Sequence, residues 1–82
     1  MENGVMRVYM IFDRLAEEAG PVFEQKNDAV ALRAYRKMLK SQGESPDEYQ
    51  LLWIGTIDHR TVKCVINDSP VEVVSGAEVP NA

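Results

Sequence analysis

The sequence predicts an α+β fold: a small antiparallel sheet of three to four strands with one amphipathic helix packed on one face. Three observations predict it. Residues 5–12 alternate with the period of two that is typical of a strand. Residues 29–42 switch to a period near 3.6, which indicates a helix. Two further strand-like segments, 50–57 and 61–66, are separated by a short polar turn at 58–60, the pattern of a hairpin.

The first strand, residues 5–12, is rich in aliphatic and aromatic residues that suit a pleated surface. Gly20-Pro21 then gives a turn signal. We therefore expect residues 14–26 to form an ordered connection with a short strand at 22–24, from which Phe23 enters the core.

The helix has recognisable ends and two different faces. Asn27 or Asp28 suits the N-cap, and Gly43 suits the left-handed position after the last turn. At 100° per residue, one arc of the helix is apolar and is formed by Ala31, Ala34, Tyr35, Met38 and Leu39. The opposite side carries four cations: Arg33, Arg36, Lys37 and Lys40.

A polar connection at residues 44–49 leads into the hairpin, and one further short strand is expected at 71–74. A chain of 82 residues has room for one domain, so we assign residues 1–82 to a single domain. Its ordered core is expected at about residues 5–74, and Gly76 and Pro80 predict a loose tail over 75–82.

The predicted strands carry apolar residues on both faces, although one helix covers only one face. In the strand at 51–57 these residues alternate, with Leu52 and Ile54 on one face and Leu51, Trp53 and Ile57 on the other. Antiparallel sheets commonly leave the second face polar. The uncovered face is expected to meet a second copy of the chain, in a homodimer, or another partner; alternatively, residues 14–26 cover it.

Composition excludes several classes of protein. There is no apolar run of 18 residues to cross a membrane, and no export signal at the start, so we expect a cytoplasmic protein. One cysteine, Cys64, and one histidine, His59, provide neither a disulfide nor a zinc site, and no cofactor is predicted. Because Cys64 alternates with Val62 and Ile66, we interpret it as a small core residue.

No residues converge on catalysis, and we expect no enzyme activity. His59 lies in a predicted turn, and the neighbouring carboxylates at 17–18 and 47–48 suit solvated loops. A glycine-rich phosphate loop is also lacking. The catalytic and metal-ligand sets are therefore empty.

The four cations of the predicted helix are therefore the main group of polar side chains that could form a binding site. The formal net charge of the chain is −4, yet residues 27–42 carry four bases and one acid, which is +4 − 1 = +3. Four phosphate contacts are one interpretation of Arg33, Arg36, Lys37 and Lys40, and an ordinary solvated helix face is the other. Four further side chains are candidates for base stacking or for an interface: Tyr9, Tyr49, Leu51 and Trp53. For each of them, a place in the hydrophobic core is the alternative interpretation.

The order of four short motifs resembles a known family. These are VYMIFD (8–13), GPVF (20–23), KNDAVALRAY (26–35) and SPDEYQLLWIGTID (45–58), and they resemble the small nonstructural protein of gokushoviruses and related microviruses, which are single-stranded-DNA phages. The resemblance covers about residues 6–75. Family members often have Thr-Gly-Lys in the last hairpin, whereas this chain has Thr61-Val62-Lys63.

The resemblance implies a nonstructural protein of the infected host's cytoplasm with a suggested DNA-binding role in the change from genome replication to packaging. It carries over no catalytic residues. The expected partners are single-stranded or replicative-form DNA and viral or host replication or packaging proteins. The alternative function is a protein-interaction module that binds a host or viral protein through its uncovered sheet face.

Overall fold

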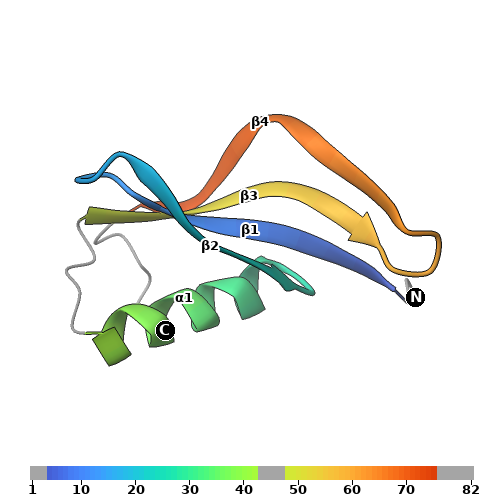
Figure 1. Cartoon of the computed structure of the whole chain (residues 1–82). Coiled ribbons are helices and arrows are strands. Elements are labelled where there is room, and N and C mark those ends of the chain that lie inside the picture. Colours follow the sequence, from blue (N-terminus) through green and yellow to red (C-terminus); the bar gives the residue numbers. More distant parts are fainter. Residues whose placement is uncertain (1–3, 43–47, 76–82) are drawn as a thin grey trace.

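A computed structural model describes residues 4–42 and 48–75 of the chain. Its elements are β1 (Val5–Asp13), β2 (Glu18–Gln25), α1 (Asp28–Gln42), β3 (Tyr49–Asp58) and β4 (Lys63–Ser75). The strands form one antiparallel sheet in the order β2-β1-β3-β4, and α1 lies on one side of it (Figure 1). The predicted α+β fold, with a helix on one face of a small sheet, is confirmed.

The core lies between α1 and the sheet. On β1, Tyr9 and Ile11 are buried, while the residues that alternate with them are only half-buried. This difference identifies the side of β1 that the helix covers. The buried cluster takes residues from the helix and three strands: Tyr9, Ile11, Ala31, Tyr35, Leu39, Leu51 and Val74.

β2 is the first departure from the sequence-based prediction. A full edge strand, Glu18–Gln25, stands where only a short strand at 22–24 was expected, and it pairs with β1 from Arg7↔Gln25 to Asp13↔Glu18. Gly20-Pro21 lies inside the strand, which an outer edge tolerates because its outward N–H groups have no partner to lose. The turn occurs earlier, where Asp13 Oδ1 accepts the N–H groups of Leu15 and Ala16, each at 3.0 Å.

The position of β2 also settles one alternative for the second sheet face. Residues 18–25 extend the sheet at its edge and do not lie over it. The suggestion that residues 14–26 cover the uncovered face is therefore wrong. In the described part of the chain, the sheet has a helix-covered face and an open face.

β4 is one bent strand, Lys63–Ser75, in place of the two expected at 61–66 and 71–74. Its pairing with β3 shifts register twice, which carries the strand past Pro70 without ending it. In Figure 1, β4 curves away from the side on which α1 lies. Cys64 is exposed, so the prediction that it is a core residue is wrong.

At the far end of the chain, Ser75 belongs to β4, and the rest of the expected tail, residues 76–82, lies outside the described residues. Gly43, which was expected to end the helix, also lies outside the described residues.

Candidate nucleic-acid interface

The first turn of α1 is fixed to the sheet by polar contacts. Asn27 caps the helix, because its Oδ1 accepts the N–H of Val30 at 3.0 Å. Asp28 Oδ1 accepts a 2.6 Å hydrogen bond from the Tyr9 hydroxyl on β1 and lies 3.3 Å from Arg7 Nε. The helix is thereby held with its apolar side against the sheet.

That orientation turns the cations of α1 outward, and the structure separates them into two groups. Arg33, Lys37 and Lys40 are exposed. Arg36 is half-buried at the flank of the helix, and its Nε is buried without a hydrogen-bond partner in the part of the chain that the structure describes. We call Arg33, Lys37 and Lys40 the basic face.

The basic face forms no ion pair with the residues that the structure describes. Asp28 is the sole acid within α1, and it lies in the first turn, where it contacts Arg7. Across residues 4–42 and 48–75, no ion pair involves Arg33, Lys37 or Lys40. These three charges are therefore available to an anionic ligand.

Two of the candidate stacking or interface residues are in the core. Tyr9 and Leu51 have no exposed surface, so neither can stack on a base or line an interface, and the core alternative applies to both. For Leu51 the cause is register: its strand neighbour Leu52 pairs with Met10, on the face opposite to Tyr9 and Ile11.

Trp53 is half-buried and packs against the core on the helix side of the sheet. The Arg7 guanidinium carbon lies 3.8 Å from its ring centroid, a cation–π contact that covers one ring face. Its Nε1–H donates to Gly55 O at 2.7 Å. One face of the Trp53 ring is therefore already covered by Arg7.

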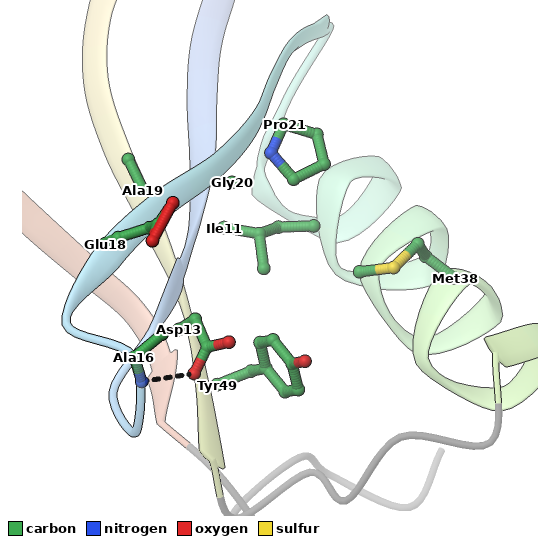
Figure 2. Close-up of a pocket in the computed structure, with 9 residues that line it drawn as sticks. All are labelled: Ile11, Asp13, Ala16, Glu18, Ala19, Gly20, Pro21, Met38 and Tyr49. Carbon is green, nitrogen blue, oxygen red and sulfur yellow. Dashed lines mark hydrogen bonds between the residues drawn. The ribbon is translucent and has the colours of Figure 1, made fainter.

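Tyr49 lies at a hollow between the β1–β2 turn and the later turns of α1 (Figure 2). The hollow has a volume of about 430 Å³ and is lined by Ile11, Asp13, Ala16, Glu18, Ala19, Gly20, Pro21, Met38 and Tyr49. Its carboxylates belong to Asp13 and Glu18, and one Asp13 oxygen already accepts the N–H groups of the turn. Such a lining repels phosphate, so the hollow is not part of the basic face.

Away from α1, one further polar pair joins β2 to the turn after β3. His59 Nε2 is 2.5 Å from Glu24 Oε1, and both side chains are solvent-accessible. Within the described ranges, no group of three His, Cys, Asp or Glu side chains is placed to hold a metal ion. None of the helices in those ranges is long and apolar enough to span a membrane.

Comparison with protein-family models matches residues 6–79 to the family described as Phage ORF5 protein. The chain belongs to this phage family. No curated protein and no solved structure matches it significantly. The expectation of a phage protein is thus confirmed, while the narrower assignment to gokushoviruses and related microviruses stays a prediction.

In this Phage ORF5 protein, the turn after β3 is built without the glycine expected from the resemblance. Asp58 Oδ1 accepts the N–H groups of Arg60 at 2.9 Å and Thr61 at 3.4 Å, and these backbone donors lower the pKa of the Asp58 carboxyl. Asp58 O accepts the N–H of Val62 at 2.8 Å, and Val62 itself has φ 60°. A β-branched residue thus adopts the left-handed conformation at the expected glycine position.

Sequence reasoning missed Arg7, which contacts Trp53, Tyr9 and Asp28 at once. A signal was present, because Arg7 alternates with Tyr9 and Ile11 and so shares their face of the strand. A cation on the covered face needs a nearby acid, which Asp28 supplies from the first turn of the helix.

Proposed function

We propose that this phage protein binds single-stranded or replicating DNA, without catalysis, through the basic face of α1. It acts in the host cytoplasm during genome replication or the change to packaging, in a single-stranded-DNA phage of the gokushovirus type, together with viral or host proteins of those processes. The observation that carries the proposal is the exposure of Arg33, Lys37 and Lys40 on one helix face with no ion pair to any described residue.

The geometry suits a short stretch of backbone. Arg33 and Lys40 are seven residues apart, which is about 10 Å along a helix axis. Lysine and arginine bind phosphates by charge and need no particular base. The expected binding is therefore sequence-independent and has a small footprint.

Because Arg36 is half-buried, we expect three phosphate contacts and not four, and this number sets the expected salt dependence of binding. Three contacts with a single strand give a log–log salt slope of about −2.1, or about 20-fold weaker binding at 200 mM than at 50 mM salt. Four contacts would give a slope of about −2.8 and about 50-fold weaker binding over the same range of salt. The chain's net charge of −4 opposes binding at long range, so we expect weak affinity that is measurable at low salt.

The test is a charge reversal with a matched control. The variant Arg33→Glu/Lys37→Glu/Lys40→Glu changes the net charge from −4 to −4 − 6 = −10. The control, Lys26→Glu/Arg60→Glu/Lys63→Glu, makes the same change at exposed cations outside α1. Fluorescence anisotropy with single- and double-stranded oligonucleotides at two salt concentrations measures both.

We expect the first variant to lose binding and salt dependence, and the control to lose far less. Equal losses would attribute the effect to net charge alone. Unchanged affinity in the first variant would refute the proposal.

A protein-interaction module is the second candidate, supported by the open apolar face of the sheet. Because Leu51 and Trp53 lie on the helix side, the informative substitutions are on the opposite side, for instance Met10→Glu. If that change abolished capture of a viral or host protein while the charge reversal of α1 did not, the interaction module would be favoured.

A further inference from the structure

The open face of the sheet is apolar across its two central strands. Met6, Val8, Met10 and Phe12 of β1 alternate with the buried Tyr9 and Ile11 and so point away from α1. Register adds the β3 partners of Met6 and Met10, which are Ile57 and Leu52. These six side chains are half-buried by their neighbours within the sheet, and α1 lies on the other side.

The outer strands continue the same surface. Val22 pairs with Met10 and is 58 % exposed, and Ile66 pairs with Gly55 and is 63 % exposed. All seven residues of the buried cluster belong to α1 or to the region it covers. A chain with a core this small gains much by burying a second apolar face.

The size of the face fits an interface between two proteins. Four strands about 4.8 Å apart and about eight residues long, at about 3.3 Å per residue, span about 500 Å² in projection. Two such faces bury about 1,000 Å², the lower limit for a specific interface. A sheet packed on a sheet, with about 10 Å between them, is a common way of forming such a contact.

The charges of the face favour a second copy as the occupant. Its acids are on the outer strands: Glu24 on β2, beside His59, and Glu72 on β4, hydrogen-bonded by Gln50 at 2.8 Å. The central strands contribute no charged group to the open face, so two copies can meet without burying an ion. A strongly charged partner would find no complementary group at the centre.

The sheet edges are less suitable for self-association. Both outer strands carry a proline, Pro21 in β2 and Pro70 in β4, and proline lacks the N–H that an added strand would need. The face is therefore the better contact between copies.

We propose that two copies of this chain pack through their open sheet faces as a symmetric dimer, centred on Met10 and Leu52. The two α1 helices then lie on the outer sides of a four-layered assembly, and each basic face stays accessible. The proposal is independent of DNA binding.

The test measures mass by light scattering over a concentration series with the full chain. We expect about 18.4 kDa at high concentration, twice the 9.2 kDa of one copy. Val22→Glu/Ile66→Glu places acids where the side chains are mostly exposed in one copy, so the fold of that copy is preserved. Because the introduced carboxylates would be buried as like charges in the interface, we expect the dimer dissociation constant to rise at least about 100-fold.

Leu15→Glu/Val62→Glu is the matched control, since both side chains are exposed in turns outside the face, 74 % and 82 % respectively. It should leave the dimer intact, and circular dichroism should show both variants folded. A wild-type chain that stays monomeric at about 100 µM, or a dimer equally tolerant of both variants, would overturn the proposal and leave the face to a different occupant.

Discussion

The Tyr9 hydroxyl donates a 2.6 Å hydrogen bond to Asp28 Oδ1 and so links the central strand to the first turn of the helix. Arg7 Nε donates to the same hydroxyl at 3.1 Å. Tyr35, the other fully buried tyrosine, has a hydroxyl with no hydrogen-bond partner among the described residues. The hydroxyl of Tyr9 is therefore expected to stabilise the fold, whereas that of Tyr35 is not.

We predict that Tyr9→Phe lowers the free energy of unfolding by about 1–2 kcal/mol, because it removes a hydrogen bond to a charged group and leaves Asp28 with one partner fewer. Tyr35→Phe is the control. It removes a buried, unpaired hydroxyl, so stability should be unchanged or slightly higher. Urea unfolding followed by circular dichroism measures both, and equal losses would contradict this account.

Alkaline pH should destabilise the protein through the same two residues. Burial and the neighbouring Asp28 raise the pKa of Tyr9 to about 12, and burial raises the pKa of Tyr35 to about 12. In the unfolded chain tyrosine titrates near 10, so between pH 10 and 12 the unfolded state binds fewer protons than the native state. Stability is therefore complete below about pH 10 and falls above it, by up to about 3 kcal/mol for each tyrosine.

The measurement is urea unfolding between pH 8 and 11.5. Tyr9→Phe and Tyr35→Phe should each flatten the decline above pH 10, because phenylalanine has no proton to lose. A wild-type stability that stayed constant over this interval would show that the tyrosines titrate alike in both states.

Val62→Gly should stabilise the protein by about 1 kcal/mol. Val62 has φ 60°, where a β-branched residue is strained by about 1–2 kcal/mol and glycine is not. Its side chain is 82 % exposed, so little packing is lost. Thermal unfolding provides the readout, and Val65→Gly, in the adjoining strand, should instead destabilise. A lower melting temperature for Val62→Gly would mean that the turn depends on the valine.

The sequence predicted the helix and its two faces well, because the Asn27 cap and the spacing of apolar residues are local features. β2 was underestimated, since Gly20-Pro21 favours a turn and only the sheet order reveals an outer edge that tolerates it. The face of β3 that α1 covers depends on pairing with β1, which slips by one residue between Val8 and Tyr9. The slip places Ile57 opposite Met6, on the open face, although strict alternation predicted it on the face of Leu51 and Trp53. Alternation alone does not say which face a helix covers, so Leu51 was placed among surface candidates, although it is in the core.

Gly55→Ala should disrupt the β3–β4 pairing. A Cβ atom at Gly55 would lie 2.5 Å from Val65 O and 3.2 Å from Ile66 Cα, both backbone atoms that cannot move without shifting β4. We expect a loss of at least about 2 kcal/mol, typical of overpacking. Hydrogen exchange should show the loss concentrated in β4. Gly20→Ala, whose Cβ would be 3.1 Å from Ile11 O, should be milder, and the reverse order would contradict the close approach at Gly55.

Trp53 fluorescence should change little when an oligonucleotide binds. It is the one tryptophan of the chain, so its emission can be followed without labelling. The Arg7 guanidinium covers one ring face at 3.8 Å, and the core contacts the side chain as well, whereas the proposed phosphate contacts are on the outward side of α1. Arg7→Ala is the positive control, because removing the cation should shift the emission in the absence of DNA. Strong quenching on DNA binding in the wild-type chain would instead indicate base stacking on Trp53, and the interface would then have to be moved from the outer face of α1 to the region around Arg7.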